Sequence, residues 1–295
     1  MLSKDFLRKE FAANPKKYYE VEIFKKEGFA RSICPKCGKG YWSLGKETCG
    51  DSSHEQYSFF KPKPLDETYV GFWKKFSDFW KKNNHEILPR YPVLSRWRDD
   101  LYFTIASIVD FQRIENGRVA FEYPANPLVV PQMCLRFPDI ANIGITGRHF
   151  SCFMMAGQHS FNYPKEGYWK DECIRLNYEF LTKVLKVSKE ELTYGEDVWS
   201  MPDFSAFGPC IESFSKGSEL VNSVFMQYRH TKDNEFTELD TKVIDVGWGF
   251  ERLLWYYRGD YTAYDAVFPK ELEFMKKQSG FKPNKELLNR YAKLS

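Results

Sequence analysis

The sequence lacks the features that would assign it to a membrane, secreted or repetitive class of protein. No apolar run approaches the roughly 18 residues that a transmembrane helix needs, and the first residues lack the apolar core of a signal peptide. There is no internal repeat and no low-complexity segment. The net charge is only +3, which allows a local basic surface but does not demand a nucleic-acid partner. We therefore expect a globular cytoplasmic protein that has no membrane partner.

Cysteine is also sparse, and its arrangement indicates metal binding. The chain has 7 cysteines, whereas a secreted disulfide scaffold would be smaller and richer in cysteine. Cys34 and Cys37 form one pair with two residues between them, and Cys49 precedes His54 at short spacing. Three thiolates and one imidazole can complete a tetrahedron around a structural Zn²⁺ and leave no position for a catalytic water. A pair of thiol turns without metal is the alternative.

Length and composition allow one large core or two modest ones. The chain has 295 residues, of which 43% are hydrophobic and 18% aromatic. Short strands with uneven connections favour an α+β fold over a parallel doubly wound sheet. We expect three parts: an N-terminal segment 1–61 with a zinc-binding insert at about 30–60, a main core 62–268, and C-terminal helices in 269–295.

Hydrophobic periodicity predicts the main elements of this fold. A helix with Phe72 and Phe76 on its inner face has Asp66 as its expected cap, and Ser188 with Glu191 is expected to form a capping box. The segment from Arg90 to Gln112 is expected to be extended. Further helices are predicted at 6–19, 169–186, 269–278 and from about 284, and strands at 119–123, 152–156 and 220–228.

The segment Val243–Leu253 carries the strongest chemical signal. A β-branched run predicts a buried strand, and Asp245 within it requires a polar or cationic partner. Gly247 and Gly249 permit a tight turn into a helix whose first turn carries Arg252. The acid can bind an amine and the arginine can bind phosphate oxygens, which suits an enzyme that handles an amino acid and a nucleotide. A dinucleotide fingerprint is excluded, because its third glycine would fall at Arg252.

A second segment, 126–163, indicates a nucleotide site. We expect a strand that ends near Arg136, a polar hairpin loop, and a return strand on which His149 and Phe153 share one face. These two rings and the neighbouring Arg148 could hold a purine and its phosphates. The alternative is that Phe153 is a core residue and Arg148 a surface charge.

The combined motifs resemble motifs 2 and 3 of class II aminoacyl-tRNA synthetases, and more narrowly the catalytic domain of the archaeal-type alanyl-tRNA synthetase family. This resemblance implies a mainly antiparallel sheet flanked by helices, with residues 62–268 as the aminoacylation core. It implies an alanine–tRNA ligase that forms alanyl-adenylate from ATP, with Mg²⁺, and transfers alanine to the 3′ end of tRNA(Ala). The supporting strings are Arg90–Asp100, Asn142–His149, Phe161–Pro164, Val224–Tyr228 and Thr262–Pro269.

The resemblance also implies roles for individual residues. Arg136 would hold the α-phosphate and Arg252 the γ-phosphate of ATP, while Phe153 stacks on adenine. Asp245 would bind the ammonium group of L-alanine. The remaining roles are His149 and Arg148 near the phosphates, Asn222 orienting the substrate, Trp199 and Met155 as pocket walls, Gly247 as an open floor, and Glu212 as a contact for magnesium.

Three features depart from the family pattern. His54 stands where a fourth cysteine is usual, and Met154 stands where glutamate is usual. The sequence also ends shortly after Arg252, so we expect a second polypeptide to supply tRNA recognition and editing.

Two other functions stay open from the sequence alone. The first is a synthetase-like paralogue that charges a non-tRNA acceptor. The second is a zinc-containing nucleic-acid-binding module that uses the basic residues Arg31, Lys36, Lys39 and Lys46.

Overall fold

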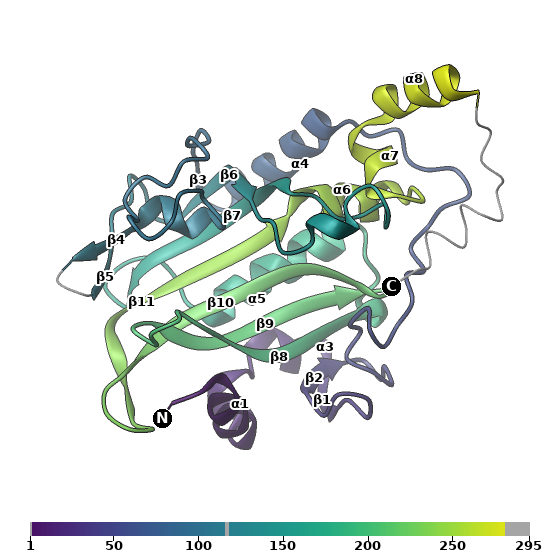
Figure 1. Cartoon of the computed structure of the whole chain (residues 1–295). Coiled ribbons are helices and arrows are strands. Elements are labelled where there is room, and N and C mark those ends of the chain that lie inside the picture. The colour runs from purple at the N-terminus through teal and green to yellow at the C-terminus, as the bar shows by residue number, and fades with distance from the viewer. Residues whose placement is uncertain (1, 116–117, 281–295) are drawn as a thin grey trace.

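A single large sheet organises the molecule. The computed structural model describes residues 2–115 and 118–280, and its main sheet has nine strands in the order β1-β2-β8-β9-β10-β11-β7-β6-β3 (Figure 1). All neighbouring strands are antiparallel except the short pair β3 and β6. The α+β class predicted from the sequence is confirmed. The strands are β1 (Ala30–Ile33), β2 (Gly40–Ser43), β3 (Glu86–Ile87), β6 (Leu128–Leu135), β7 (Cys152–Tyr163), β8 (Leu192–Ser200), β9 (Phe207–Ser215), β10 (Ser218–His230) and β11 (Phe236–Gly249).

Helices cover much of one face of this sheet, and the predicted site residues lie on the other face. Successive side chains of a strand point to opposite faces, and Trp248 of β11 points toward the helices. Its ring lies 5.7 Å from Phe76 and 5.1 Å from Phe180, measured between centroids. The helices are α1 (Lys4–Ala13), α2 (Pro15–Tyr18), α3 (Glu22–Glu27), α4 (Tyr69–Lys82), α5 (Lys170–Glu179), α6 (Phe250–Arg258), α7 (Ala263–Val267) and α8 (Pro269–Ser279). None of the helices in the described ranges is long and apolar enough to cross a membrane.

Helix ends correct two predictions from the sequence. The side chain of Thr68, and not of Asp66, caps α4 by accepting a hydrogen bond from the backbone N–H of Gly71 at 2.9 Å. Ser188 forms no capping box, because its hydroxyl contacts Glu190 and makes no cap hydrogen bond. Glu191 instead accepts from Lys46 at 2.8 Å. At Ser188 and Glu191, other partners compete successfully for the capping groups.

The predicted helix over 169–186 is confirmed, with a change of winding near its end. α5 continues into a π-helical turn, Phe180–Val184, in which Phe180 and Leu181 are buried. α8 ends at Gly280, whose φ of 63° is the left-handed conformation that favours glycine. The helix predicted from about 284 lies outside the described residues.

The segment 88–111 is less extended than the sequence predicts. Its one bridge outside the named strands joins Leu94 to Phe103, and Ser107–Phe111 form a buried 3₁₀ turn. All five residues of this turn are buried against the rest of the protein. β-propensity does not predict such a turn, because tertiary packing decides it. A small hairpin of β4 (Gln112–Glu115) and β5 (Arg118–Phe121) follows it.

The cysteine-rich insert is part of the same sheet. β2 pairs with β8 through Trp42 and Tyr194, so β1 and β2 extend the sheet at one edge (Figure 1). Arg31 of β1 is bound at 2.7 Å by both carboxylate oxygens of Glu196 on β8. The insert is therefore held by backbone pairing and by a bidentate ion pair.

Candidate functional site

One cavity, between the sheet and the residues of α6 and α7, is lined by most of the predicted site residues. Its volume is about 730 Å³, within the usual range for small-molecule sites. It is lined by Asp245, Arg136 and Arg252, the acid and the two arginines singled out from the sequence. The other predicted residues in its lining are Arg148, His149, Phe153, Met155, Trp199, Asn222 and Gly247.

Strand register explains why these residues meet. On β11, Asp245, Gly247 and Gly249 alternate with the helix-facing Val246 and Trp248. Asn222 of β10 lies opposite Gly247, and Met155 of β7 lies opposite Gly249. Three neighbouring strands therefore direct their polar or small residues to the same face.

Asp245 lines the cavity from β11. Its side chain is 11% exposed, and burial raises the pKa of its carboxyl to about 7, while the positive charge of Arg136 acts in the opposite direction. None of the hydrogen bonds among the described residues involves this carboxylate, and His159 Nδ1 lies 3.4 Å from its Oδ1. A buried carboxylate of this kind is a binding site for a cationic group.

The two predicted phosphate arginines lie on separate walls. Arg252, in the first turn of α6, donates from Nη1 to the backbone oxygen of Glu219 at 3.0 Å and also pairs with its carboxylate. Arg136 follows β6 and donates from Nε to the Ile105 oxygen at 2.8 Å. Its guanidinium lies 5.2 Å from the centre of the Phe153 ring. These anchors leave other guanidinium N–H groups of both arginines to meet an anion.

His149 is not on a strand, which corrects the prediction for this segment. β7 begins only at Cys152, and His149 lies in the preceding loop, with Nδ1 2.6 Å from the Thr146 hydroxyl. Burial and the nearby Arg148 lower the pKa of His149. The guanidinium of Arg148 lies 5.2 Å from the ring centre of Tyr57. Both residues still line the cavity, because the loop folds back over it.

Met155, Trp199, Val224 and Gly247 line the same cavity as Asp245. A Cβ atom built on Gly247 would lie 3.2 Å from Met155 Sδ, which is tighter than ordinary van der Waals contact. The absence of a side chain at position 247 therefore keeps open the space beside Asp245.

Glu212 lies apart from the main cavity. It lines a smaller hollow of about 150 Å³ beside the cysteine cluster. Its Oε1 accepts a hydrogen bond from Asn222 Nδ2 at 3.3 Å, so the amide oxygen of Asn222 is the group turned away from Glu212. Burial raises the pKa of Glu212 to about 7. Glu212 thus contacts a site residue rather than the cavity itself.

Three residues of the cavity were not singled out from the sequence. Glu251 accepts hydrogen bonds from the Met154 backbone N–H at 2.9 Å and from the Tyr69 hydroxyl at 2.8 Å, which ties α6 to β7 and α4. Glu219 pairs with Arg252, and Tyr57 carries the contact with Arg148. Glu251 immediately precedes Arg252 in the first turn of α6. An acid next to a predicted site residue, in a segment expected to be buried, is a signal that the sequence offers for it.

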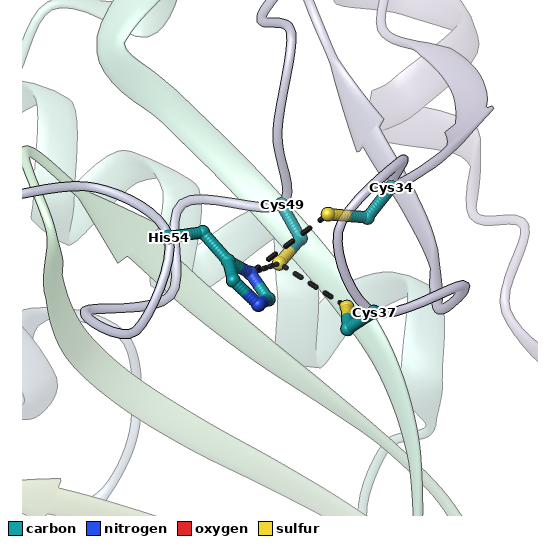
Figure 2. A group of neighbouring side chains, drawn as sticks. All are labelled: Cys34, Cys37, Cys49 and His54. Atoms are coloured by element: carbon teal, nitrogen blue, oxygen red, sulfur yellow. Dashed lines mark hydrogen bonds between the residues drawn. The ribbon is translucent and has the colours of Figure 1, made fainter.

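The cysteine cluster has the geometry of a closed metal site. Figure 2 shows Cys34, Cys37, Cys49 and His54 pointing toward one another, and their ligand atoms lie within 4.8 Å of one another. The separations are 3.8 Å from Cys34 Sγ to His54 Nδ1, 3.9 Å from Cys37 Sγ to Cys49 Sγ, and 3.2 Å from Cys49 Sγ to His54 Nδ1. Tetrahedral Zn²⁺ with bonds of about 2.3 Å to sulfur separates its ligands by about 3.5–3.8 Å. The residues therefore fit zinc without a free coordination position.

The basic residues around this cluster are engaged by the protein itself. Lys39 pairs with Asp197, and Lys46 with Glu191. Arg31 is bound by Glu196, and Lys36 donates to the His54 backbone oxygen at 3.0 Å. Arg31, Lys39 and Lys46 are thus paired with carboxylates, and paired cations contribute less to the positive surface that nucleic-acid binding requires. The observation argues against a nucleic-acid module built around the cluster.

Comparison with known proteins gives a consistent result. Residues 72–214 match the family model described as tRNA synthetases class II (A). The chain is 46% identical over 294 residues to "Alanine--tRNA ligase" from Nitrosopumilus maritimus, covering 98% of this chain and 33% of that protein. It is 48% identical over 270 residues to the protein of the same description from Cenarchaeum symbiosum, covering 90% of this chain and 30% of that protein. The chain thus spans about a third of the length of these curated relatives.

A solved structure shows a more distant likeness. A pyrrolysyl-tRNA synthetase from Desulfitobacterium hafniense overlaps 70% of this chain and 71% of its own, at 12% identity and a TM-score of 0.40.

Proposed function

Because the chain belongs to the class II aminoacyl-tRNA synthetases, of the alanine type, we propose that it activates L-alanine with ATP to alanyl-adenylate and passes the alanyl group to tRNA(Ala). One observation carries this proposal: a buried carboxylate, Asp245, and two arginines, Arg136 and Arg252, line one cavity of nucleotide size. An amine and a polyphosphate can therefore bind side by side. We also propose that the reaction takes place in the cytoplasm.

Asp245 positions alanine for this reaction. Its carboxylate holds the substrate ammonium, with the Asn222 amide oxygen as a second acceptor. Met155, Trp199 and Gly247 leave room for a methyl side chain next to these groups. The substrate carboxylate is then free to point toward the phosphate-binding arginines.

The arginines supply positive charge next to the phosphate oxygens, where negative charge develops in the reaction. An alanine carboxylate oxygen forms a bond to the α-phosphorus, the bond to the bridging oxygen breaks, and pyrophosphate leaves with the electron pair. The nucleophile is already ionised, so the chain needs to supply positioning and charge stabilisation rather than a general base. We assign Arg136 to the α-phosphate, Arg252 to the γ-phosphate, and Phe153 to the adenine ring, with His149 and Arg148 beside the phosphates.

Magnesium bound with ATP would neutralise charge on the phosphate oxygens. Of the carboxylates that line the cavity, we assign Glu219 to hold it, since Glu219 pairs with Arg252, which we assign to the γ-phosphate. Glu212, expected for this role from the sequence, lines the smaller hollow instead.

Alanine-dependent ATP–pyrophosphate exchange tests the proposed activation step. We expect exchange with alanine, weaker exchange with serine and glycine, and none with larger amino acids. A methyl-sized pocket discriminates against glycine by only about 1–3 kcal/mol. Exchange that requires a different amino acid, or no exchange with any amino acid, would overturn the proposal.

Transfer to tRNA is proposed to use protein outside this chain. Because the curated relatives are about three times longer, we propose a second polypeptide that carries tRNA recognition and editing. The test is aminoacylation of tRNA(Ala) by this chain alone and with the remaining part of the Nitrosopumilus maritimus relative added. Equal charging in both reactions would contradict the need for a partner. Alanine transfer to a non-tRNA acceptor in the same assay would favour the paralogue instead.

A further inference from the structure

We propose that His159, held in place by Ser107, is a positioning residue that donates from Nδ1 to Asp245 and keeps this carboxylate ionised and aimed at the substrate ammonium. The inference rests on the proposed alanine activation and adds two residues to it. Neither residue lines the cavity, so both act through Asp245.

The three residues come from separate elements and are all buried. His159 of β7 lies directly opposite Asp245 of β11 in the antiparallel ladder, so their side chains point to the same face. His159 Nδ1 lies 3.4 Å from Asp245 Oδ1, and its Nε2 lies 3.0 Å from the Ser107 hydroxyl oxygen. His159 and Ser107 are both completely inaccessible to solvent.

Burial fixes the protonation state of His159. It lowers the pKa of the imidazole to about 3, against a smaller raising effect of the Ile244 backbone, so one ring nitrogen carries a proton at neutral pH. A proton on Nε2 would leave the Nδ1 lone pair facing the Asp245 carboxylate, which is repulsive. A proton on Nδ1 gives an attractive contact with Asp245, and Nε2 then accepts from the Ser107 hydroxyl.

The Nδ1 atom makes no hydrogen bond that meets the usual distance and angle limits, although it is fully buried. The Ile244 backbone is the other polar group that acts on the imidazole. Buried ring nitrogens are normally satisfied. A small approach of the carboxylate, as expected when an ammonium group binds on its other side, would complete the pair.

The surrounding residues keep this arrangement in place. A Cβ atom on Gly157 would overlap both the Ser107 hydroxyl and the His159 ring, so glycine is required for the two to meet. The rings of Phe111 and Phe161 flank the imidazole, with centroids 5.5 Å and 5.9 Å away. The imidazole has little freedom to turn away from Asp245.

Few other charges act on Asp245. Arg136, which follows β6, is the charged group that lowers the pKa of Asp245, and Nδ1 of His159 on β7 lies 3.4 Å from its Oδ1. The β10 residues next to it in the cavity are neutral, namely Asn222 and Val224. We expect removal of the Nδ1 donor to alter the ionisation of Asp245, because a hydrogen bond to the charged form of a carboxyl favours that form.

Two substitutions of His159 separate its two nitrogens. His159→Asn places an amide near the position of Nδ1, whereas His159→Gln extends an amide toward the position of Nε2. We expect His159→Gln to raise the KM for alanine about tenfold, the usual effect of losing a hydrogen bond to a charged group. The pH at which this KM begins to rise should move up by about one unit. His159→Asn should restore most of the loss, and the KM for ATP should change less than twofold in both variants.

Controls separate positioning from folding. His85 is also buried and hydrogen-bonded, to the Asn83 backbone oxygen and the Tyr168 hydroxyl, but it does not line the cavity. His85→Gln should lower the melting temperature without changing the KM for alanine. If His159→Gln does not fold, Ser107→Ala serves as the test, because it removes only a hydroxyl and should raise the KM for alanine by a few-fold.

Two outcomes would overturn the inference. One is equal change in the KM for alanine in the Gln and Asn variants, and the other is a normal KM and pH profile in His159→Gln or Ser107→Ala. Either result leaves the proposed function intact, since the wild-type protein would still show alanine-dependent exchange. Lack of that exchange in the wild-type protein would refute both.

Discussion

At the scale of single residues, a buried carboxylate sets the substrate class that we propose. Asp245 is held among apolar strand neighbours, and Val243, Ile244 and Val246 are all buried. A carboxylate in such surroundings is stabilised by a cation that enters the cavity. An α-ammonium group meets this requirement, and the small space beside Gly247 limits the side chain that can accompany it.

The pH dependence of alanine binding follows from this carboxyl group. Burial raises the pKa of Asp245 to about 7, so below that pH the neutral form accumulates and no longer attracts an ammonium. We expect the KM for alanine to be constant at high pH and to rise about tenfold per unit below the pKa. Exchange kinetics between pH 6 and pH 9 measure it.

Asp245→Asn provides the matched variant. It keeps the size of the side chain and removes its charge, so the KM for alanine should rise about 100-fold and become independent of pH. The KM for ATP is the control and should stay within a few-fold of its original value. A pH profile that persists in Asp245→Asn would contradict the assignment.

Gly247→Ala tests the size of the pocket. The added Cβ would lie 3.2 Å from Met155 Sδ, so the Met155 side chain must move and the space beside Asp245 shrinks. We expect the KM for alanine to rise about tenfold and exchange with glycine to be less affected, because glycine needs less room. Gly249→Ala is the control on the same strand, since a Cβ there has its nearest contact at 3.7 Å. Equal loss for alanine and glycine would argue that position 247 is not part of the side-chain pocket.

At the scale of elements, successive side chains of β11 point to opposite faces of the sheet, so one strand contributes both to the core and to the cavity. Its even-numbered residues Val246 and Trp248 pack toward the helices, and Asp245 and Gly247 face the cavity. α4 brings Phe72, Phe76 and Trp80 against the same layer. The start of α4 therefore affects the packing behind the site.

Thr68→Ala tests the observed cap of α4. Loss of the hydrogen bond to the Gly71 N–H should destabilise the fold by about 1 kcal/mol. Asp66→Ala, at the position expected from the sequence, should change the free energy of unfolding by less than about 0.5 kcal/mol. Denaturant unfolding of the two variants decides between them. A larger effect at Asp66 would show that the cap lies earlier in the chain.

At the scale of the whole molecule, the cysteine cluster connects one sheet edge to the cavity. The loop that carries Cys49 and His54 also carries Ser52, which lines the cavity, and Tyr57 follows shortly after. β2, between the two ligand pairs, is a strand of the main sheet. A metal bound by this cluster would therefore stabilise both the sheet edge and one cavity wall.

Removal of the metal should affect both stability and substrate binding. We expect one equivalent of zinc per chain, and a strong chelator should lower the melting temperature by at least about 5 °C, because structural zinc contributes folding energy. The KM for ATP should rise as the Tyr57 wall loosens. Zinc content measured by atomic emission and thermal unfolding with and without chelator check this expectation. His54→Cys is the control and should retain the metal, since four thiolates also suit zinc.

Several features were readable from the sequence because they depend on neighbours along the chain. The spacing of Cys34, Cys37, Cys49 and His54 predicted a cluster that the fold does bring together. The β-branched run around Asp245 predicted a strand that leads into a helix, and β11 and α6 have this arrangement. Strand and helix periods repeat over a few residues, so local composition is enough to detect them.

Other features depended on partners distant in the sequence. Four of them are the Thr68 cap, the loop position of His149, the pairing of Glu212 with Asn222, and the contact of His159 with Asp245. At each of these positions the local sequence allows more than one conformation or hydrogen-bond partner. The sequence by itself determined the α+β class, and it predicted the cluster of three cysteines and one histidine and singled out the acid and arginines that line the cavity, because residue type and short spacing define them. Only the tertiary structure decided which of these groups share a cavity and which support it from behind, because strand register brings together residues that are far apart in the chain.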